Sequence, residues 1–335
     1  MKRRKHILII RLSSMGDVAM VVPVLRELLI NNKNYKISLL TNFQFFPFFR
    51  TFNEIDLIPF DKKKQHKGVF GMFRLYKEIK KLDLDYVVDL HSVLRTNFLR
   101  AFIKVPFYQI DKGRCEKENL VSGKVFTQLK STHQRYRDVF KKIGISIDPS
   151  IKNQTDRLDI SDLKSIPKNN KLLIGVAPFA AHKGKEYPIL QMEEVIKEIN
   201  KNFNVILFGG GNKEELILDH IAGKYTNVIN IANKFSLNQE MDVISNLKLM
   251  LSMDSANGHI AALMGIKVLT IWGVTHPYAG FCPYGQQDQN NILANREQFP
   301  KIPTSIYGDK FPNGYEKAIS SISPKEIILK IKTMV

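Results

Sequence analysis

Cysteine is scarce in this sequence: the chain of 335 residues has only Cys115 and Cys282. They stand far apart and in no paired motif, so we expect neither a disulfide framework nor a thiolate metal site, and a reducing cytoplasm fits best. The one D-x-D sequence, Asp83 to Asp85, precedes a predicted strand, whereas a nucleotide-bound cation would be held at the carboxyl end of a strand. We therefore expect no metal ion and no cofactor.

Long apolar runs are missing as well. No segment approaches the roughly 20 apolar residues that a helix needs to cross a bilayer. The basic N-terminus, MKRRKH, leads into a stretch that Arg11, Asp17 and Arg26 make too polar for a signal peptide. Any membrane contact is therefore expected to be peripheral, and the basic N-terminus would assist it.

Acidic residues are few relative to basic ones: 32 Asp and Glu stand against 50 Lys and Arg, a formal net charge of +18 at pH 7. This charge favours a polyanionic partner, such as a nucleotide, a phosphorylated glycolipid, a phospholipid surface or a nucleic acid. Nucleic acid is not expected, because the basic residues are scattered and no zinc-finger, basic-zipper or RNA-binding signature occurs. The plain alternative is a solvated basic surface.

Short apolar segments alternate with segments of helical periodicity through both halves of the chain, which is typical of parallel sheets wrapped by helices. The predicted strands are 7–12, 36–40, 56–60, 86–90, 105–110, 172–177, 205–208, 228–231, 249–253 and 268–272. The predicted helices are 18–30, 44–51, 69–82, 92–102, 189–199, 213–221, 237–247, 257–264 and 324–334.

A polar segment at 144–170 separates the two halves. We therefore predict an α/β protein with two doubly wound, Rossmann-like domains, 1–160 and 161–335, facing a cleft. Packing of the last helix, 324–334, against the first domain is left open. Ligands of such sheets bind at the carboxyl ends of strands, so functional residues are expected in the strand-to-helix turns.

The first such turn holds Asp17. It follows the apolar run 7–12 and the small polar residues Ser13, Ser14 and Gly16, at the start of a helix. Asp17 is either a helix-start carboxylate that interacts with free backbone N–H groups, the reading that the turn alone favours, or a general base that reaches a substrate hydroxyl.

Three further turns carry polar residues. The segment 251–265 contains Asp254, Ser255 and His259, which read either as a helix cap with a surface histidine or as part of an anion site. Lys185 lies in the loop 178–188 and is able to neutralise a phosphate. The loop 209–215, GGGNKEE, lacks the G-x-G-x-x-G spacing of a nicotinamide site.

Four segments in order resemble glycosyltransferase family nine, the lipopolysaccharide heptosyltransferase family. They are ILIIRLSSMGDV at 7–18, VVDLHSVLRT at 87–96, KEYP at 185–188 and MDSANGHIAALMGIKVLTIWG at 253–273. The resemblance runs from about Ile7 to Ile331. It implies a GT-B fold and an inverting, metal-independent transfer of a sugar from a nucleotide diphosphate donor.

Residue by residue, the resemblance makes Asp17 the catalytic base and Ser13, Ser14 and Gly16 part of an acceptor-side turn. The residues that it assigns to the donor are Lys185, Glu214, Phe235, Asp254, Ser255, Ala256, Gly258 and His259. Separately, Arg95 and Arg100 on a predicted helix either meet an acceptor phosphate or carboxylate or are solvated helix charges.

The resemblance implies heptose transfer from ADP-heptose to a lipid A-linked lipopolysaccharide core, by a cytoplasmic enzyme peripheral to the inner membrane. Its partners would be a nucleotide sugar and an anionic glycolipid. Three departures from the family pattern, Ala180, Ala181 and Ala256, leave the donor sugar open. The alternatives are a sugar-nucleotide epimerase of similar fold and a non-catalytic basic binding protein.

Overall fold

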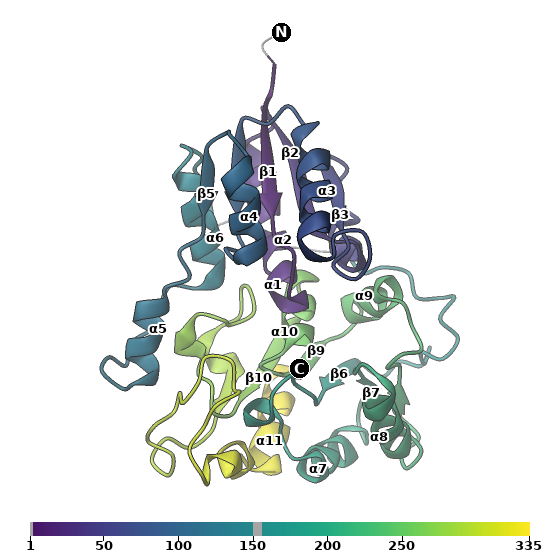
Figure 1. Cartoon of the computed structure of the whole chain (residues 1–335). Coiled ribbons are helices and arrows are strands. Elements are labelled where there is room, and N and C mark those ends of the chain that lie inside the picture. Colours follow the sequence, from purple (N-terminus) through teal and green to yellow (C-terminus); the bar gives the residue numbers. More distant parts are fainter. Residues whose placement is uncertain (1–2, 150–155) are drawn as a thin grey trace. The chain divides into compact units, whose positions relative to one another are not determined.

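The computed structural model describes residues 3–149 and 156–335. The chain divides into two compact units: unit 1 comprises Met1–Lys112 and Thr132–Lys152, and unit 2 comprises Gly113–Ser131 and Asn153–Val335. Each unit contains one parallel sheet with helices around it (Figure 1). The prediction of two parallel-sheet α/β domains is thereby confirmed. The predicted cut between residues 160 and 161 is a different division, and residues 150–155 of the predicted junction lie outside the described residues.

The sheet of unit 1 has the order β3-β2-β1-β4-β5, with all pairs parallel. Its strands are β1 (Lys5–Ile10), β2 (Tyr35–Asn42), β3 (Ile55–Phe60), β4 (Tyr86–Asp89) and β5 (Phe107–Gln109). The central strand β1 is fully buried from Ile7 to Ile10. A continuous apolar run is what a strand covered by helices on both faces requires.

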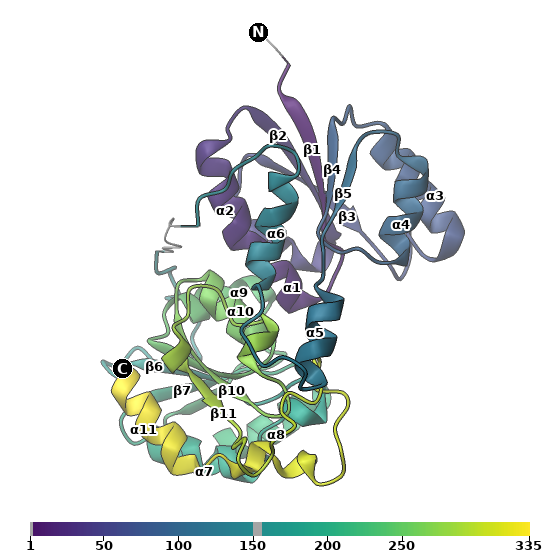
Figure 2. The same cartoon turned by 90° about the vertical axis from the view of Figure 1, so that its left-hand side faces the viewer.

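Helices cover both faces of this sheet. The helices of unit 1 are α1 (Met15–Ala19), α2 (Val21–Asn31), α3 (Gly68–Lys80), α4 (Leu94–Phe102) and α6 (Thr132–Lys141), with a 3-10 helix at Phe43–Phe49. Helices α2 and α6 pack together on one face and α3 and α4 on the other (Figure 2). The predicted helix 44–51 is the short 3-10 helix, which contains Pro47.

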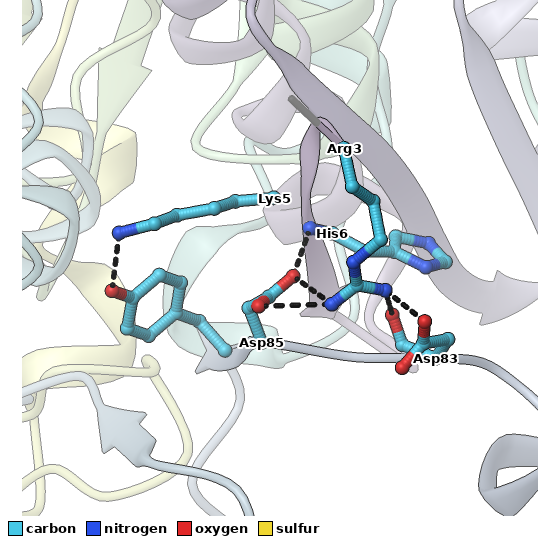
Figure 3. A network of polar contacts seen from close by, with 6 residues as sticks. Arg3, Lys5, His6, Asp83 and Asp85 are labelled. Carbon is cyan, nitrogen blue, oxygen red and sulfur yellow. Dashed lines mark hydrogen bonds and ion pairs between the residues drawn. The ribbon is translucent and has the colours of Figure 1, made fainter. Parts of the chain in front are cut away.

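A charged network joins the amino ends of β1 and β4 (Figure 3). The guanidinium of Arg3 contacts the carboxylates of Asp83 and Asp85, and the backbone N–H of His6 donates to Asp85 at 2.7 Å. Lys5 Nζ donates to the hydroxyl of Tyr86 at 3.2 Å. The D-x-D carboxylates therefore support strand pairing at the amino edge of the sheet.

The sheet of unit 2 has the order β11-β10-β9-β6-β7-β8. Its strands are β6 (Leu173–Ala177), β7 (Asn204–Leu207), β8 (Val228–Asn230), β9 (Leu249–Met253), β10 (Lys267–Trp272) and β11 (Asn291–Leu293). Its helices are α5 (Arg114–Val121), α7 (Ile189–Ile199), α8 (Asn212–Ala222), α9 (Leu237–Ser245), α10 (Ala256–Leu263) and α11 (Pro324–Met334). Short 3-10 helices lie at Lys183–Lys185, Pro277–Ala279, Asp288–Asn290, Tyr315–Lys317 and Ile319–Ser321.

Apolar side chains of α7, α8 and α11 pack on one face of this sheet, and α9 packs with α10 on the other. The last helix, α11, packs against α7. Tyr187 is buried before α7, and its hydroxyl donates to the carbonyl of Ile322 at 2.8 Å.

Each sheet has one switch point, where two neighbouring strands lead into helices on opposite faces of the sheet. In unit 1 this point lies between β1 and β4, because β1 leads into α2 on one face and β4 leads into α4 on the other. In unit 2 it lies between β6 and β9, which lead into α7 and α10. Ligands of open parallel sheets bind at the carboxyl ends of the strands at such switch points.

Candidate functional site

Asp17 lies at the switch point of unit 1, as the third residue of α1. Its Oδ2 accepts a hydrogen bond from Ser14 Oγ at 2.8 Å and pairs with Arg11 Nη2 at 2.5 Å. The backbone N–H of Ser14 lies 3.4 Å from the same oxygen. The helix-start interaction expected from the sequence is therefore present, and a side chain that is 25% exposed is still open to a ligand.

Arg11, at the end of β1, holds Asp17 in place. Its Nη1 donates to the carbonyl of Leu90, after β4, at 2.6 Å. The guanidinium lies 5.9 Å from the ring centroid of the buried Tyr136, whose hydroxyl donates to the Asp17 carbonyl at 3.2 Å. Arg11 is therefore a buried cation that ties β1, β4 and α6 to one carboxylate. In the sequence, Arg11 is only a polar interruption of an apolar stretch.

The turn after β4, which Arg11 contacts at Leu90, is the second element beside Asp17. The buried carboxylate of Asp89 accepts the backbone N–H groups of His91 at 2.8 Å and Ser92 at 3.0 Å. Ser92 has a φ of 47°, so the chain turns sharply there. Burial, followed by the positive charges of Arg11 and Lys112, lowers the pKa of His91 to about 3. His91 is therefore a neutral imidazole next to Asp17 and Arg11.

The predicted acceptor residues divide into two groups. Ser13, Ser14 and Gly16 share the turn with Asp17. Arg95 is exposed in the first turn of α4, and its charge acts on His91. Arg100 lies in the last turn of α4 and donates to Gln109 Oε1 at 2.8 Å, while Gln109 Nε2 donates to Asp89 at 2.9 Å. Arg100 thus supports the loop through Gln109.

Lys185 and Asp254 meet at the switch point of unit 2, as their places after β6 and β9 require. Lys185 Nζ lies 2.8 Å from Asp254 Oδ2, and Thr275 Oγ1 donates to the same oxygen at 3.0 Å. Both charged side chains are largely buried, with exposures of 14% and 7%. Thr275 was not predicted, because it follows β10 in a segment without a recognisable motif.

Close backbone contacts position Lys185. A Cβ atom at Gly184 would lie 2.4 Å from Val274 Cγ2 and 2.7 Å from the Gly308 carbonyl. The N–H of Gly184 donates to Gly308, and its carbonyl accepts from the N–H of Val274 at 2.9 Å. A residue with a side chain does not fit at position 184, so the lysine is presented from a loop fixed by backbone hydrogen bonds.

Ser255 is the N-cap residue of α10, and its Oγ lies 3.1 Å from Ser252 Oγ. Ala256 and Gly258 lie in the first turn of this helix, and a Cβ at Gly258 would lie 3.3 Å from Ser252 Oγ. His259 is 8% exposed, so its alternative interpretation as a surface residue is wrong. The absence of a side chain at Gly258 thus lets the first turn of α10 lie close to Ser252 of β9.

The remaining predicted donor residues follow the next two strands. Glu214, in the first turn of α8 after β7, accepts the N–H of Gly210 at 2.8 Å. Phe235 is half-buried between β8 and α9. The predicted donor residues therefore follow four adjacent strands at the same edge of the sheet: β9, β6, β7 and β8.

Within residues 3–149 and 156–335, no group of three or more His, Cys, Asp and Glu residues is arranged to hold a metal ion. Within the same ranges, no helix has the length and apolar character that crossing a bilayer requires.

The chain is similar to known proteins in both sequence and fold. The chain is 26% identical to the lipopolysaccharide core heptosyltransferase OpsX of Haemophilus influenzae, over 88% of this chain and 85% of that protein. Its fold is similar to that of a family 9 glycosyl transferase from Veillonella parvula, with a TM-score of 0.78 and 20% identity over 100% of this chain and 98% of that one.

The fold is also similar to that of the Escherichia coli heptosyltransferase WaaC, which has been solved with ADP and with ADP-2-deoxy-2-fluoro heptose. For the ADP complex, the TM-score is 0.72 with 18% identity over 98% of this chain and 100% of that one. These likenesses confirm the GT-B fold class. Residues 72–307, more than half of the chain, match the model of glycosyltransferase family 9 (heptosyltransferase), so the protein belongs to this family and is a glycosyltransferase.

Proposed function

We propose that this enzyme transfers heptose from ADP-heptose to a lipid A-linked lipopolysaccharide core, with inversion at the anomeric carbon and without a metal ion. The names of its relatives support heptose as the sugar and the core as the acceptor, and the ADP complexes of WaaC support the nucleotide. The observation that carries the proposal is the placement of Asp17 at the switch point of unit 1, fixed by Arg11 and Ser14.

Asp17 is the proposed general base. An inverting transfer is a single displacement, in which the acceptor hydroxyl attacks the anomeric carbon and loses its proton to a base. Arg11 and Ser14 engage Asp17 Oδ2, so the carboxylate is oriented before the acceptor arrives. The neutral His91 beside it adds no second positive charge. Arg95 and the turn residues Ser13, Ser14 and Gly16 are the proposed acceptor contacts.

Lys185 and the start of α10 are the proposed stabilisers of the departing diphosphate. A lysine ammonium has three N–H donors, so Lys185 is able to keep Asp254 and bind a phosphate oxygen at the same time. The free N–H groups at the first turn of α10, with Ser255, Ala256 and Gly258, suit the same anion. Glu214 and Phe235 are the proposed contacts to the nucleoside.

The proposed partners are the nucleotide sugar and an anionic glycolipid, met by a cytoplasmic enzyme at the inner membrane surface. Family membership favours transfer over the epimerase and binding-protein alternatives. The test is incubation of the purified protein with ADP-heptose, with and without a lipid A–core acceptor. Release of ADP only when the acceptor is present supports the proposal. Isomerisation of the donor without acceptor would support an epimerase. The absence of both reactions would support a binding protein.

A further inference from the structure

Large apolar side chains lie exposed on the outer surface of α3 and α4, within unit 1. Phe70, in the first turn of α3, is 91% exposed, and Leu94, the first residue of α4, is 87% exposed. Val69 is 62% exposed beside Phe70. Single exposed apolar residues are common on protein surfaces, but a contiguous group of large ones marks an interaction site.

Aromatic rings connect this surface across the two helices. The ring of Phe73 lies 5.0 Å from that of Phe98 and 5.2 Å from that of Phe102, measured between centroids. Phe98 and Phe102 are 4.8 Å apart. Phe73 lies one helical turn after Phe70, so the aromatic group continues the exposed side chains of the first turn. We call Val69, Phe70, Phe73, Leu94, Phe98 and Phe102 the α3–α4 apolar surface.

The segments that carry the α3–α4 apolar surface are rich in basic residues. The loop before α3 and the two helices, residues 61–80 and 94–104, contain ten Lys and Arg but only two acidic residues, Asp61 and Glu78. Asp61 accepts the backbone N–H groups of two residues of its own loop, and Glu78 lies 3.3 Å from His66 Nε2. The exposed lysines of the loop, Lys62, Lys63, Lys64 and Lys67, thus have little opposing charge.

The α3–α4 apolar surface begins at the edge of the sheet that carries Asp17. Helices α3 and α4 follow β3 and β4, and α1 follows β1, so all three helices start at the carboxyl edge of the same parallel sheet (Figure 2). Phe70 and Leu94 lie in the first turns of α3 and α4. The exposed apolar side chains and the lysine loop are thus on the side of unit 1 where an acceptor would enter.

We infer that the α3–α4 apolar surface and the lysine loop dock unit 1 on an anionic phospholipid bilayer. Phenylalanine and leucine next to lysine and arginine are the combination that inserts into the headgroup region of such a bilayer. A protein partner is less well matched, because lysine is depleted at protein interfaces. This inference deepens the proposed function and rests on it for its purpose, since docking would hold Asp17 near a membrane-bound glycolipid.

The test is co-sedimentation of the full chain with vesicles of phosphatidylethanolamine and phosphatidylglycerol, without donor or acceptor. Three forms are compared: the wild type, Phe70→Glu, and Leu329→Glu, a control on α11 in which the replaced leucine is 66% exposed. Equal thermal midpoints for the three forms establish that both variants fold. We expect Phe70→Glu to weaken vesicle binding about tenfold or more, because the replacement removes apolar area that docking would bury in the bilayer. Leu329→Glu should leave vesicle binding unchanged, because Leu329 lies outside the docking surface. Binding of the wild type should fall with added salt and with neutral phosphatidylcholine vesicles.

Several results would overturn the inference. One is that the wild type does not bind the anionic vesicles. Another is that Phe70→Glu binds them as well as Leu329→Glu does. If sedimentation velocity showed instead a dimer of the wild type that Phe70→Glu abolishes, with no vesicle binding, the surface would be an interface between copies of the chain. In a separate assay on the same protein preparations, ADP release is measured with ADP-heptose and a water-soluble acceptor fragment. Vesicle binding without ADP release would contradict the proposed function alone, and ADP release without vesicle binding would contradict the docking surface alone.

Discussion

Arg11 Nη2 and Asp17 Oδ2 lie 2.5 Å apart, in an ion pair whose arginine side chain is only 8% exposed. Because Arg11 also donates to the Leu90 carbonyl, its guanidinium has a fixed position, and the carboxylate is held with it. The pair therefore connects the end of the central strand to the proposed base. It gives Asp17 an orientation that a residue at an exposed helix start would not have.

Replacement of Arg11 tests this connection. Arg11→Met removes a charged donor from the partly exposed Asp17 carboxylate and from the Leu90 carbonyl, so we expect the free energy of unfolding to fall by about 1–3 kcal/mol. Arg11→Lys keeps the charge but lacks the planar fork that serves Leu90 and Asp17 together, so it should fold while turnover falls. Urea unfolding and the rate of ADP release measure the two effects. Wild-type turnover in Arg11→Lys would contradict the positioning role.

Lys185 tests the donor side. Lys185→Ala should weaken the thermal shift produced by ADP, because a phosphate loses a charged partner and Asp254 is left without its cation. Thr275→Val removes only the neutral hydrogen bond to Asp254 and should have a smaller effect. If the ADP-induced shift is the same in the wild type and Lys185→Ala, the lysine does not contact the diphosphate.

Gly184 tests the loop that presents Lys185. In Gly184→Ala the new Cβ would lie 2.4 Å from Val274 Cγ2, so we expect a loss of about 1–3 kcal/mol in the free energy of unfolding. Gly210→Ala is the matched control, because a Cβ at Gly210 would have no neighbouring heavy atom within 4 Å. Urea unfolding midpoints compare the two variants. Equal midpoints would show that the loop yields easily.

His91 has a consequence for pH dependence. Its pKa is about 3 in the folded protein, whereas the ordinary value is 6.5, so the unfolded chain binds the proton more tightly between these pH values. Stability is therefore lost as the pH falls from 6.5 toward 3, by about 1.4 kcal/mol for each pH unit, and His91 contributes nothing above 6.5. Compared with the wild type, His91→Asn should gain stability steadily as the pH is lowered from 6.5. A difference in unfolding free energy that does not change with pH would contradict the buried, neutral histidine.

The sequence predicts the fold well where strands are short, apolar and followed by a turn. Helices α7 and α11 and strand β9 have the predicted bounds, and Lys185 and Asp254 meet because both follow neighbouring strands. Helix α6 was not predicted, because its buried face includes the polar His133 and Arg135, which interrupt the apolar periodicity. Helix α5 and strand β11 were also not predicted.

The contacts that orient the site lie beyond such patterns. Tyr136 reaches Asp17 across 119 positions of the chain, and Arg11 reaches Leu90 across 79. Neither contact corresponds to a short-range pattern in the sequence, so the residues that support the proposed base are identified only from the structure. The strand-to-helix turns place Asp17 and Lys185, and the family resemblance implies their proposed roles, whereas the contacts of Arg11, His91 and Thr275 follow from packing.

The proposed role of Asp17 as the base predicts the turnover of Asp17→Asn with ADP-heptose and a lipid A–core acceptor. The amide keeps the size of the side chain but cannot take the proton, and a positioned base typically contributes 10²–10⁴-fold. We therefore predict a loss of turnover of about that size, with the thermal shift produced by ADP retained. Asp83→Asn, at the amino edge of the same sheet, should keep its turnover. Full turnover in Asp17→Asn would show that Asp17 is not the base.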